Sequence, residues 1–572
     1  MTETTPNEAT RAAAADWPLR PWLLAGLLGL AGLLIHLVTQ GNDQVPWQMA
    51  VAAFLFFGAI AAAFTLENDR WKGPAVFALA VGAVMAGLAW RAVRYGEYLP
   101  DEQYGFAAGV VATALALPLF QAEFHRRRFA TPYAEIYGHV WTDAICAAGA
   151  LAFTGLSWLS LALMSELFHL LKIDFLRDLM DEGAFGWTFS GLAAGAALGT
   201  LRNQLKVLAP LQTVVRLVAS LLAVPLAVGL VVFLLATAVS GPQVLWDATR
   251  SATPLLLACA AGAFVLANAI ARQDDEAMTR SRVMRVAGWI LAAVILPLAA
   301  FAAVSMGLRL DQYGIAPERL WGLVAIVVAC VCGVGYWAAL IRGRKTGWAS
   351  YLRKATFHVG LAVCGLALLL ALPILDFGAI STRNQLARLE SGEVPVDEFD
   401  FAALRWDFGE SGRRALRQLA DSRDARIAEL ADAALAQTTR MFGYGETVRA
   451  EEDFDLRVQP DDPALRDLVL DHLKGNAWQC QDSCVALDLG PAPDGGRRVA
   501  IVQGAGYQTI ILKPGEVGVL PVETASAAIE LKPGSTVEIR EVPTRYVFID
   551  GKPLRQPLDE PTAPLEGQPR PR

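Results

Sequence analysis

Four polar side chains lie within or at the edge of long apolar segments, where an ionisable or amide group is costly and often functional: His139, Asp143, Arg216 and Asn268. His139 and Asp143 are four residues apart, so a helix would place them on one face. There they form an ion pair or a proton-relay element, or else they belong to a solvated helix end. Arg216 and Asn268 either line a polar path through the membrane or have structural roles. In the structural reading, Arg216 reaches the surface and Asn268 bonds a neighbouring helix.

Two cysteines, Cys480 and Cys484, stand apart from the other five, which lie in apolar segments. In an oxidising compartment a local pair of this kind forms a disulfide. A redox-active thiol pair would instead read C-x-x-C beside a βαβ pattern, and we find no such pattern in the sequence. Only His472 is close by, which leaves a four-ligand zinc site incomplete. We therefore predict a structural disulfide, with no metal and no cofactor.

Signatures of catalysis are missing from the sequence, which contains no G-x-S-x-G, H-E-x-x-H or Walker-type motif. Acidic residues gather in two loops, at 97–102 and 174–182. A metal-dependent, lipid-linked glycosyl transferase would need paired carboxylates of this kind, but a charge run is more typical of a solvated face. We predict no catalytic residues.

The composition indicates a membrane protein. Of 572 residues, 54% are hydrophobic and only 18% are charged, whereas soluble domains have about 25% charged residues. Long apolar segments alternate with short charged loops up to residue 375, and the remainder reads as water-soluble sequence. The net charge of −7 and the lack of an arginine-rich, aromatic-interleaved stretch exclude a nucleic-acid-binding protein.

A membrane-spanning helix needs about 20 mainly apolar residues, because the hydrocarbon core is about 30 Å thick. Eleven segments qualify: 22–38, 45–66, 74–90, 106–120, 140–163, 185–201, 213–236, 252–271, 286–308, 320–341 and 356–375. The sixth is rich in glycine and alanine, which favours burial against other helices. The predicted fold is an α-helical polytopic membrane bundle followed by a soluble α+β domain.

Lysine and arginine residues predict the orientation, because positively charged loops stay in the cytoplasm. One alternate set of loops holds eighteen of them and the other set holds seven. The N-terminus is therefore expected in the cytoplasm. With eleven spans, the C-terminal domain is expected outside, in the periplasm if the bacterium is Gram-negative.

The soluble part divides in two. The predicted helices begin with one that has Ser381 as its N-cap and ends at Gly392; the others cover 410–441, with a break near Asp421, and 463–473. Short β runs then cover 485–489, 498–503, 509–512, 517–520, 527–531, 536–542 and 546–549, typical of a small, mostly antiparallel sandwich or barrel. The expected organisation is a cytoplasmic tail (1–21), the bundle (22–375), an external helical region (376–476), an external β-rich module (477–559) and a disordered tail (560–572).

Several short motifs occur in order around the last span: GRKTGW from Gly343, LPILD ending at Asp376, ISTRNQLARL from Ile380, FDFAALR from Phe399 and GRRAL from Gly412. With the membrane topology, they resemble bacterial membrane proteins of the domain of unknown function 4153 family. The resemblance covers about residues 22–440. It implies a bacterial multi-span protein, and it supplies no catalytic residues and no established activity.

Two functions from different classes follow. In the first, the bundle anchors an external domain that binds envelope proteins or cell-wall components, which suits the soluble part of nearly two hundred residues. In the second, a transporter or lipid-handling protein uses a polar path through the bundle. The sequence contains no repeated pattern of interrupted helices, which is the usual sign of a transporter site, so the second function has less support.

Overall fold

The computed structural model describes residues 17–40, 45–100, 102–240, 252–344, 347–437, 455–475, 479–480, 483–491, 496–503, 506–512, 522–526, 546–549 and 552–557. The chain forms two compact units, which divide between Gln437 and Thr438. The first unit contains the helical bundle together with the helices that follow it. The second unit contains the sheet. The predicted disordered tail (560–572) and the predicted strands 517–520, 527–531 and 536–542 lie outside the described residues.

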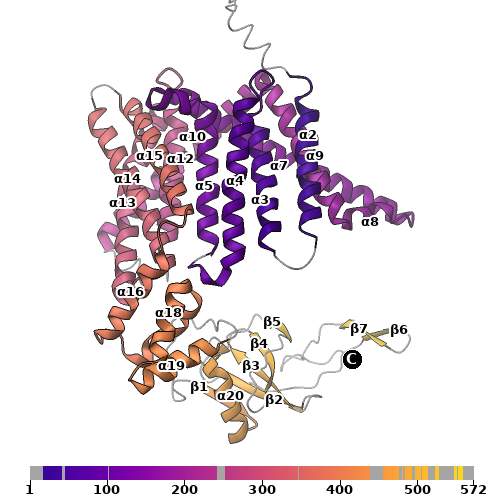
Figure 1. Ribbon diagram of the computed structural model, residues 1–572, viewed down its shortest axis with the longest axis vertical. Helices are drawn as coiled ribbons and strands as arrows, with labels where there is room; N and C mark the ends of the chain where they lie inside the picture. Colours follow the sequence, from indigo (N-terminus) through magenta and orange to yellow (C-terminus); the bar gives the residue numbers. More distant parts are fainter. Residues whose placement is uncertain are drawn as a thin grey trace, which may run out of the picture. The chain divides into compact units, whose positions relative to one another are not determined.

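Ten helices of the described chain are long and apolar enough to cross a membrane. They are α2 (Arg20–Val38), α3 (Pro46–Thr65), α4 (Lys72–Tyr95), α5 (Glu102–Gln121), α7 (Tyr133–Leu170), α10 (Leu205–Ser240), α12 (Ala252–Ala271), α13 (Arg282–Tyr313), α14 (Pro317–Arg342) and α15 (Trp348–Ala371). They stand side by side (Figure 1). Short elements lie between them: η1 (Gly96–Tyr98), α6 (Phe124–Arg127), η2 (Arg128–Ala130) and α8 (Phe175–Asp181). The predicted polytopic bundle is confirmed.

Helix α9 (Gly183–Asn203), which contains the sixth predicted span, is not among those ten but runs antiparallel along α2. A Cβ atom added at Gly191 would meet the backbone of Leu28, and one added at Gly195 would meet the backbone of Leu24. Glycine at this four-residue spacing lets the two backbones touch, which is the close approach that small residues permit. Helix α9 contacts α2 along most of the length of α9. The two helices therefore extend through the same depth of the bundle in opposite directions.

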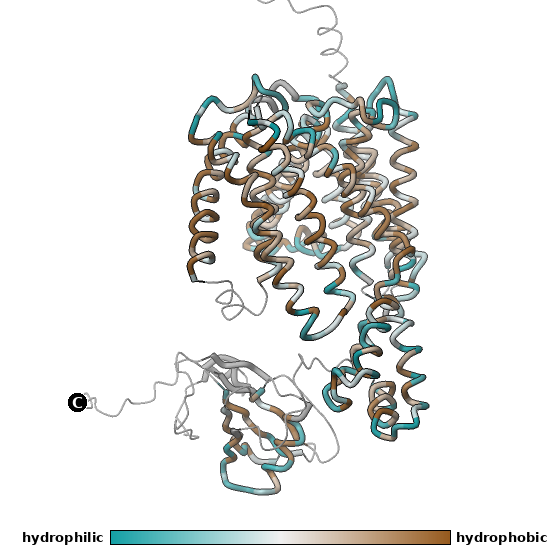
Figure 2. The backbone as a smooth tube through the Cα atoms, turned by 90° about the vertical axis from the view of Figure 1, so that its left-hand side faces the viewer, coloured by the Kyte–Doolittle hydropathy of each residue, from teal (hydrophilic) through white to brown (hydrophobic). Residues whose placement is uncertain are grey.

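The two ends of the bundle differ in their cations. One end, called here the arginine-rich end, carries most of the described lysines and arginines from the more positive set of loops, among them Arg70, Arg126, Arg127 and Arg128. Side chains there join neighbouring segments: Arg20 of α2 donates to Asn203 Oδ1 of α9 over 3.0 Å, and Arg70 and Glu123, from two connections between helices, pair over 2.9 Å. Figure 2 shows the hydrophobic middle of the helices between more hydrophilic ends.

The opposite end, called here the capped end, carries the cap, a group of short helices beside the ends of α13 and α14: α16 (Phe377–Glu390), η3 (Val396–Glu398), α17 (Phe401–Trp406), α18 (Gly409–Ala420) and α19 (Ala425–Ala436). Gln385 of α16 donates to the carbonyl of Tyr313 over 2.9 Å, and Arg388 donates to the carbonyl of Gln312 over 3.1 Å. The cap is therefore bonded to the end of α13 and belongs to the same unit as the bundle.

The sequence places the start of α16 wrongly. The helix begins at Phe377, and the Asp376 side chain caps it by accepting from the Ala379 amide over 2.9 Å. Ser381, the predicted N-cap, is buried one turn inside the helix. Gly392 follows the helix with φ +72°, a left-handed conformation that glycine adopts freely, so the predicted end is confirmed.

The second unit contains a five-stranded sheet in the order β1-β2-β3-β4-β5 and a separate hairpin. The strands are β1 (Asp455–Gln459), β2 (Ser483–Pro491), β3 (Arg497–Gln503), β4 (Gly506–Leu512), β5 (Val522–Ser526), β6 (Tyr546–Ile549) and β7 (Lys552–Pro557). Three pairs in the sheet are antiparallel and β1–β2 is parallel. Helix α20 (Pro463–Gly475) connects the parallel pair.

This connection corrects a second prediction, that no βαβ pattern accompanies the two cysteines. The β1–α20–β2 segment is such a unit, and its core joins Leu465 and Val469 of α20 to Val499 and Ile501 of β3. The first strand, DLRVQ, is short and alternates charged with apolar residues, so nothing local marks it as part of a parallel pair.

Candidate functional site

Asn268 lies near the end of α12 and joins side chains from three other helices. This group, called here the asparagine cluster, consists of Tyr133 on α7, Asn268, Tyr336 on α14 and Thr356 on α15. Asn268 Nδ2 donates to Tyr336 Oη over 2.6 Å, and Thr356 Oγ1 donates to Asn268 Oδ1 over 3.0 Å. The Tyr336 and Thr356 hydroxyls are 2.8 Å apart, which closes a ring of three hydrogen bonds.

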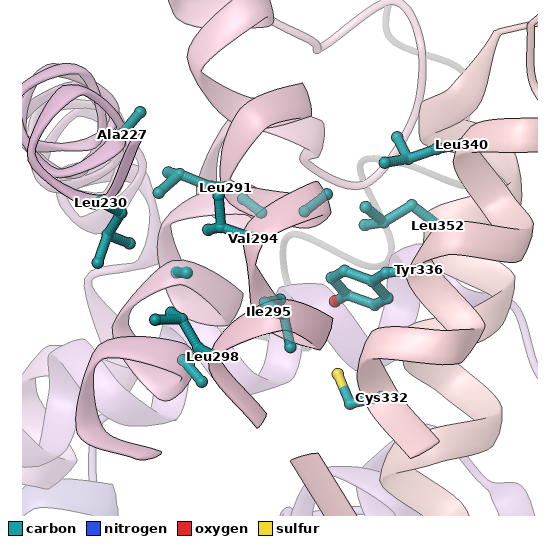
Figure 3. Close-up of a cluster of buried hydrophobic side chains, with 14 of the residues drawn as sticks. Ala227, Leu230, Leu291, Val294, Ile295, Leu298, Cys332, Tyr336, Leu340 and Leu352 are labelled. Carbon is teal, nitrogen blue, oxygen red and sulfur yellow. The ribbon is translucent and has the colours of Figure 1, made fainter. Parts of the chain in front are cut away.

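The amide group of Asn268 has a hydrogen-bond partner for each of its donors and for its acceptor. The second Nδ2 proton of Asn268 is donated to the Phe264 carbonyl over 2.8 Å, and Tyr133 Oη adds a longer bond of 3.4 Å to Asn268 Oδ1. Tyr336 is fully buried, and Figure 3 shows its ring among Ile295, Cys332 and Leu352. Polar side chains that bond one another between apolar helices hold the helices together. The geometry therefore favours the structural role of Asn268 over a path-lining role.

Arg353 of α15 lies beside this cluster and is also buried. Its Nη2 donates to the carbonyl of Ala271 over 3.0 Å, and its Nε donates to the carbonyl of Arg272 over 3.0 Å. A further bond of 2.7 Å reaches Asp275. These carbonyls are at the C-terminus of α12, where a cation also complements the helix dipole. From the sequence, Arg353 is expected in a loop before a span at 356–375. Helix α15 instead begins at Trp348, so Arg353 lies within the helix and is buried.

Arg216 of α10 is half-buried. Its Nε donates to the carbonyl of Gln212 over 3.1 Å, one turn back on the same helix. Its Nη1 reaches Gln273 Oε1 over 3.4 Å, just beyond the end of α12. The guanidinium group thus extends towards the arginine-rich end, and the structure does not join it by a hydrogen bond to Asn268.

Asp143 and His139 both lie half-buried on α7, one turn apart, but no ion pair joins them. Asp143 Oδ1 instead accepts from Gln121 Nε2 over 3.3 Å, and Gln121 also donates to the Phe64 carbonyl over 3.0 Å. Within the described chain, Asp143 Oδ2 and Gln121 Oε1 are buried acceptors without a donor. The two side chains are therefore not bonded to each other, and Asp143 belongs to a contact between α5 and α7.

Cys480 and Cys484 form a disulfide, and both are almost completely buried in the core of the second unit. Next to them, His472 of α20 shares a hydrogen bond of 2.8 Å with Gln479 Oε1. Burial lowers the pKa of His472, so its imidazole is neutral in the core. Among the described residues, no group of three His, Cys, Asp or Glu side chains is placed to hold a metal.

Arg497 of β3 ties the sheet to α20, because it pairs with Asp462 and Asp488 over 2.7 Å each. Its hydrogen bonds hold the pKa of both carboxyl groups below the usual range. Groups with lowered pKa stabilise the fold above their unfolded pKa and lose that effect as the pH falls. We expect hydrogen exchange of β2 and β3 amides, normalised for intrinsic rates, to accelerate below about pH 4 in the full-length protein.

The matched control is Arg498, the exposed neighbour of Arg497 on the same strand. Arg497→Gln should make exchange in β2 and β3 faster at neutral pH and remove most of its acid dependence, whereas Arg498→Gln should change neither. Equal acid dependence in both variants would show that other carboxylates control this unit.

A cavity of about 220 Å³ lies at the capped end, between the bundle and the cap. Its residues come from the ends of α4, α5 and α15, from the loop around η1, from α14 and from α16 and α18. They are Leu88, Arg91, Ala92, Tyr98, Leu99, Pro100, Gly105, Phe106, Trp321, Leu370, Leu372, Pro373, Leu375, Asp376, Phe377, Glu410, Ser411 and Arg414. Trp321 contacts the Phe377 ring edge-on at 5.1 Å between centroids. The cavity thus has an aromatic wall and a charged rim.

The sequence alone does not indicate this cavity. Arg91 reads as one of a few loop charges, and Arg414 reads as one of many arginines on an amphipathic helix. More than 300 residues separate them, and only the fold brings them to one cavity. Likewise, Tyr133, Tyr336 and Thr356 carry no local signal that predicts the asparagine cluster.

A family model described as "Domain of unknown function (DUF4153)" matches residues 23–419. The matched segment includes the bundle, the cap as far as α18, and every residue that lines the cavity at the capped end. The second unit lies beyond it. No curated protein and no solved structure matches the chain.

Proposed function

We propose that this chain, which belongs to the DUF4153 family, is an envelope protein whose bundle holds the cap and the second unit outside the cytoplasm as a binding platform. Partners of the platform are other envelope proteins or cell-wall components. The observation that carries the proposal is the difference between the two ends of the bundle. The loops with most lysines and arginines lie at one end, and the cap is bonded to the other. Positively charged loops favour the cytoplasm, so the cap belongs on the external side.

Two further features support an external platform. The disulfide of the second unit suits an oxidising compartment. The cap is hydrogen-bonded to the bundle rather than tethered loosely, so it presents a fixed surface to a partner. A polar path through the bundle has less support, because Asn268 is hydrogen-bonded within the asparagine cluster and Arg216 bonds Gln212 and Gln273 instead.

Cysteine labelling in intact cells tests the orientation. Single cysteines are introduced at Asp69, in the loop between α3 and α4, and at Arg423, between α18 and α19; both side chains are exposed. A membrane-impermeant maleimide should label Arg423→Cys in intact cells and Asp69→Cys only after the cells are broken. The native cysteines serve as background, since Cys480 and Cys484 are bonded and buried and the other five lie in spans.

The reverse labelling pattern would place the cap in the cytoplasm and overturn the proposal. The disulfide is measured separately in the same cells, by alkylation under denaturing conditions with and without reductant. Two additional thiols should appear after reduction, and the Cys480→Ser, Cys484→Ser double variant should show no increase.

A further inference from the structure

The cavity at the capped end combines an apolar floor with a charged rim. Leu88 of α4, Phe106 of α5 and Leu370 of α15 belong to membrane-spanning helices and form the apolar part. Asp376 and Arg414 come from the cap. The cavity therefore crosses the boundary between the hydrocarbon region and water, which is where the headgroup of a lipid lies.

The two described carboxylates that line the cavity already have hydrogen-bond partners. Asp376 Oδ1 accepts from the Ala379 amide, and its Oδ2 accepts from Ser411 Oγ over 3.2 Å. Glu410 pairs with Arg417 over 2.7 Å, outside the cavity lining. Asp376 thus accepts two hydrogen bonds from neutral groups of the protein, and Glu410 is paired with a cation.

The two arginines on the rim are not compensated in this way. Arg91 has no hydrogen bond or ion pair with any described residue, although it is half-buried. Arg414 donates only to the backbone carbonyl of Glu410, over 3.4 Å. The planar guanidinium fork matches the oxygens of phosphate or carboxylate, and such charge-assisted bonds are among the strongest in proteins. Among the described lining residues, the hydrogen-bonding capacity left over is therefore mainly that of the two guanidinium groups.

We propose that this cavity binds a phosphate-bearing anion through Arg91 and Arg414. Its volume of about 220 Å³ is below the ~300–1,000 Å³ of sites that enclose a whole drug-sized ligand, so it suits a headgroup-sized fragment. The apolar floor would contact the glycerol and first acyl carbons of an anionic phospholipid; a free phosphate ester shares the same headgroup chemistry. Binding would also link bundle and cap, since Arg91 comes from α4 and Arg414 from α18. The inference rests on the proposed function only for the side of the membrane that the cavity faces.

The test uses the purified full-length protein in neutral detergent micelles. The thermal unfolding midpoint is measured against increasing phosphatidylglycerol, phosphatidylcholine or glycerol 3-phosphate. Phosphatidylglycerol should raise the unfolding midpoint of the wild type. The Arg91→Gln, Arg414→Gln double variant should need at least about ten times as much of this lipid for the same shift in midpoint. The matched control is the Arg94→Gln, Arg383→Gln double variant, since both arginines are exposed and neither lines the cavity.

The probes distinguish the source of the ligand. In one outcome, glycerol 3-phosphate also raises the unfolding midpoint of the wild type and loses that effect in the Arg91→Gln, Arg414→Gln double variant. That result would support the site and assign it to a soluble phosphate ester. Equal shifts in the two double variants, or equal shifts with phosphatidylcholine and phosphatidylglycerol, would overturn the proposal.

A second measurement covers the case in which the double variant unfolds without lipid. Trp321 lines the cavity, so the fluorescence difference between wild type and Trp321→Phe should change on addition of phosphatidylglycerol. No change in that difference would also overturn the proposal. Binding in micelles does not depend on orientation, and labelling in cells does not depend on lipid, so either proposal can fail alone.

Discussion

Gly195→Ala is expected to destabilise the bundle by about 3 kcal/mol, at the upper end for the insertion of a methyl group into a packed core. The added Cβ would meet the carbonyl of Leu24 and the Cα atom of Ala25. Both are backbone atoms of α2, so no side chain can move aside and the two helices must separate. Unfolding of the purified protein by sodium dodecyl sulfate, followed by circular dichroism, measures the change in free energy.

Gly26→Ala is the matched control, because Gly26 lies on α2 itself and a Cβ added there meets no atom within 4 Å. The same chemical change should leave stability unaltered or raise it by up to about 1 kcal/mol, since alanine is the better helix former. If both variants proved equally stable, the close approach of α2 and α9 would not be a determinant of the fold.

Arg353→Met is expected to lower the free energy of unfolding by about 2–4 kcal/mol, because it leaves buried carbonyl groups without a donor. The carbonyls of Ala271 and Arg272 lose their bonds at the end of α12. Asp275 contributes less to the loss, since its side chain is 62% exposed and water replaces the lost partner. The measurement is the same detergent unfolding titration.

Lys354 provides the comparison for Arg353. It follows directly in sequence, carries the same charge and is exposed, with its ammonium group 5.9 Å from the Tyr351 ring. Lys354→Met should change stability by less than about 0.5 kcal/mol, as is usual for exposed positions. A loss as large as that of Arg353→Met would show that the charge at this end of the bundle matters rather than the capping of α12.

The parts of the fold that local sequence determines are predicted well. The break between α18 and α19 falls at the predicted Asp421, and strands β2, β3, β4 and β6 overlap predicted runs. Both Asp376 and Ser381 are residue types that suit an N-cap, so the sequence does not decide between them. Asp376 takes this role in the structure, and helix α16 therefore starts earlier than predicted. Strand β1 is missed because its partner β2 lies beyond α20, so pairing depends on a contact distant in sequence.

In the candidate sites, too, local sequence predicts some residues, and others depend on contacts distant in sequence. Asn268 is visible in the sequence because an amide in an apolar segment is unusual, but its partners Tyr336 and Thr356 are ordinary residues of other helices. Arg353 is hidden among the loop cations because charge alone does not distinguish an exposed arginine from a buried helix cap. Only tertiary contacts separate these cases, and the sequence does not encode them locally.

The antiparallel contact between α2 and α9 has a consequence for biogenesis. Helix α9 is less apolar than its neighbours, so by itself it would partition weakly into the bilayer during insertion. Its glycines fit the backbone of α2, which is synthesised first and is already available as a docking partner. The fit of α9 against α2 therefore supplies a contact within the protein that compensates for the weaker apolar character of α9.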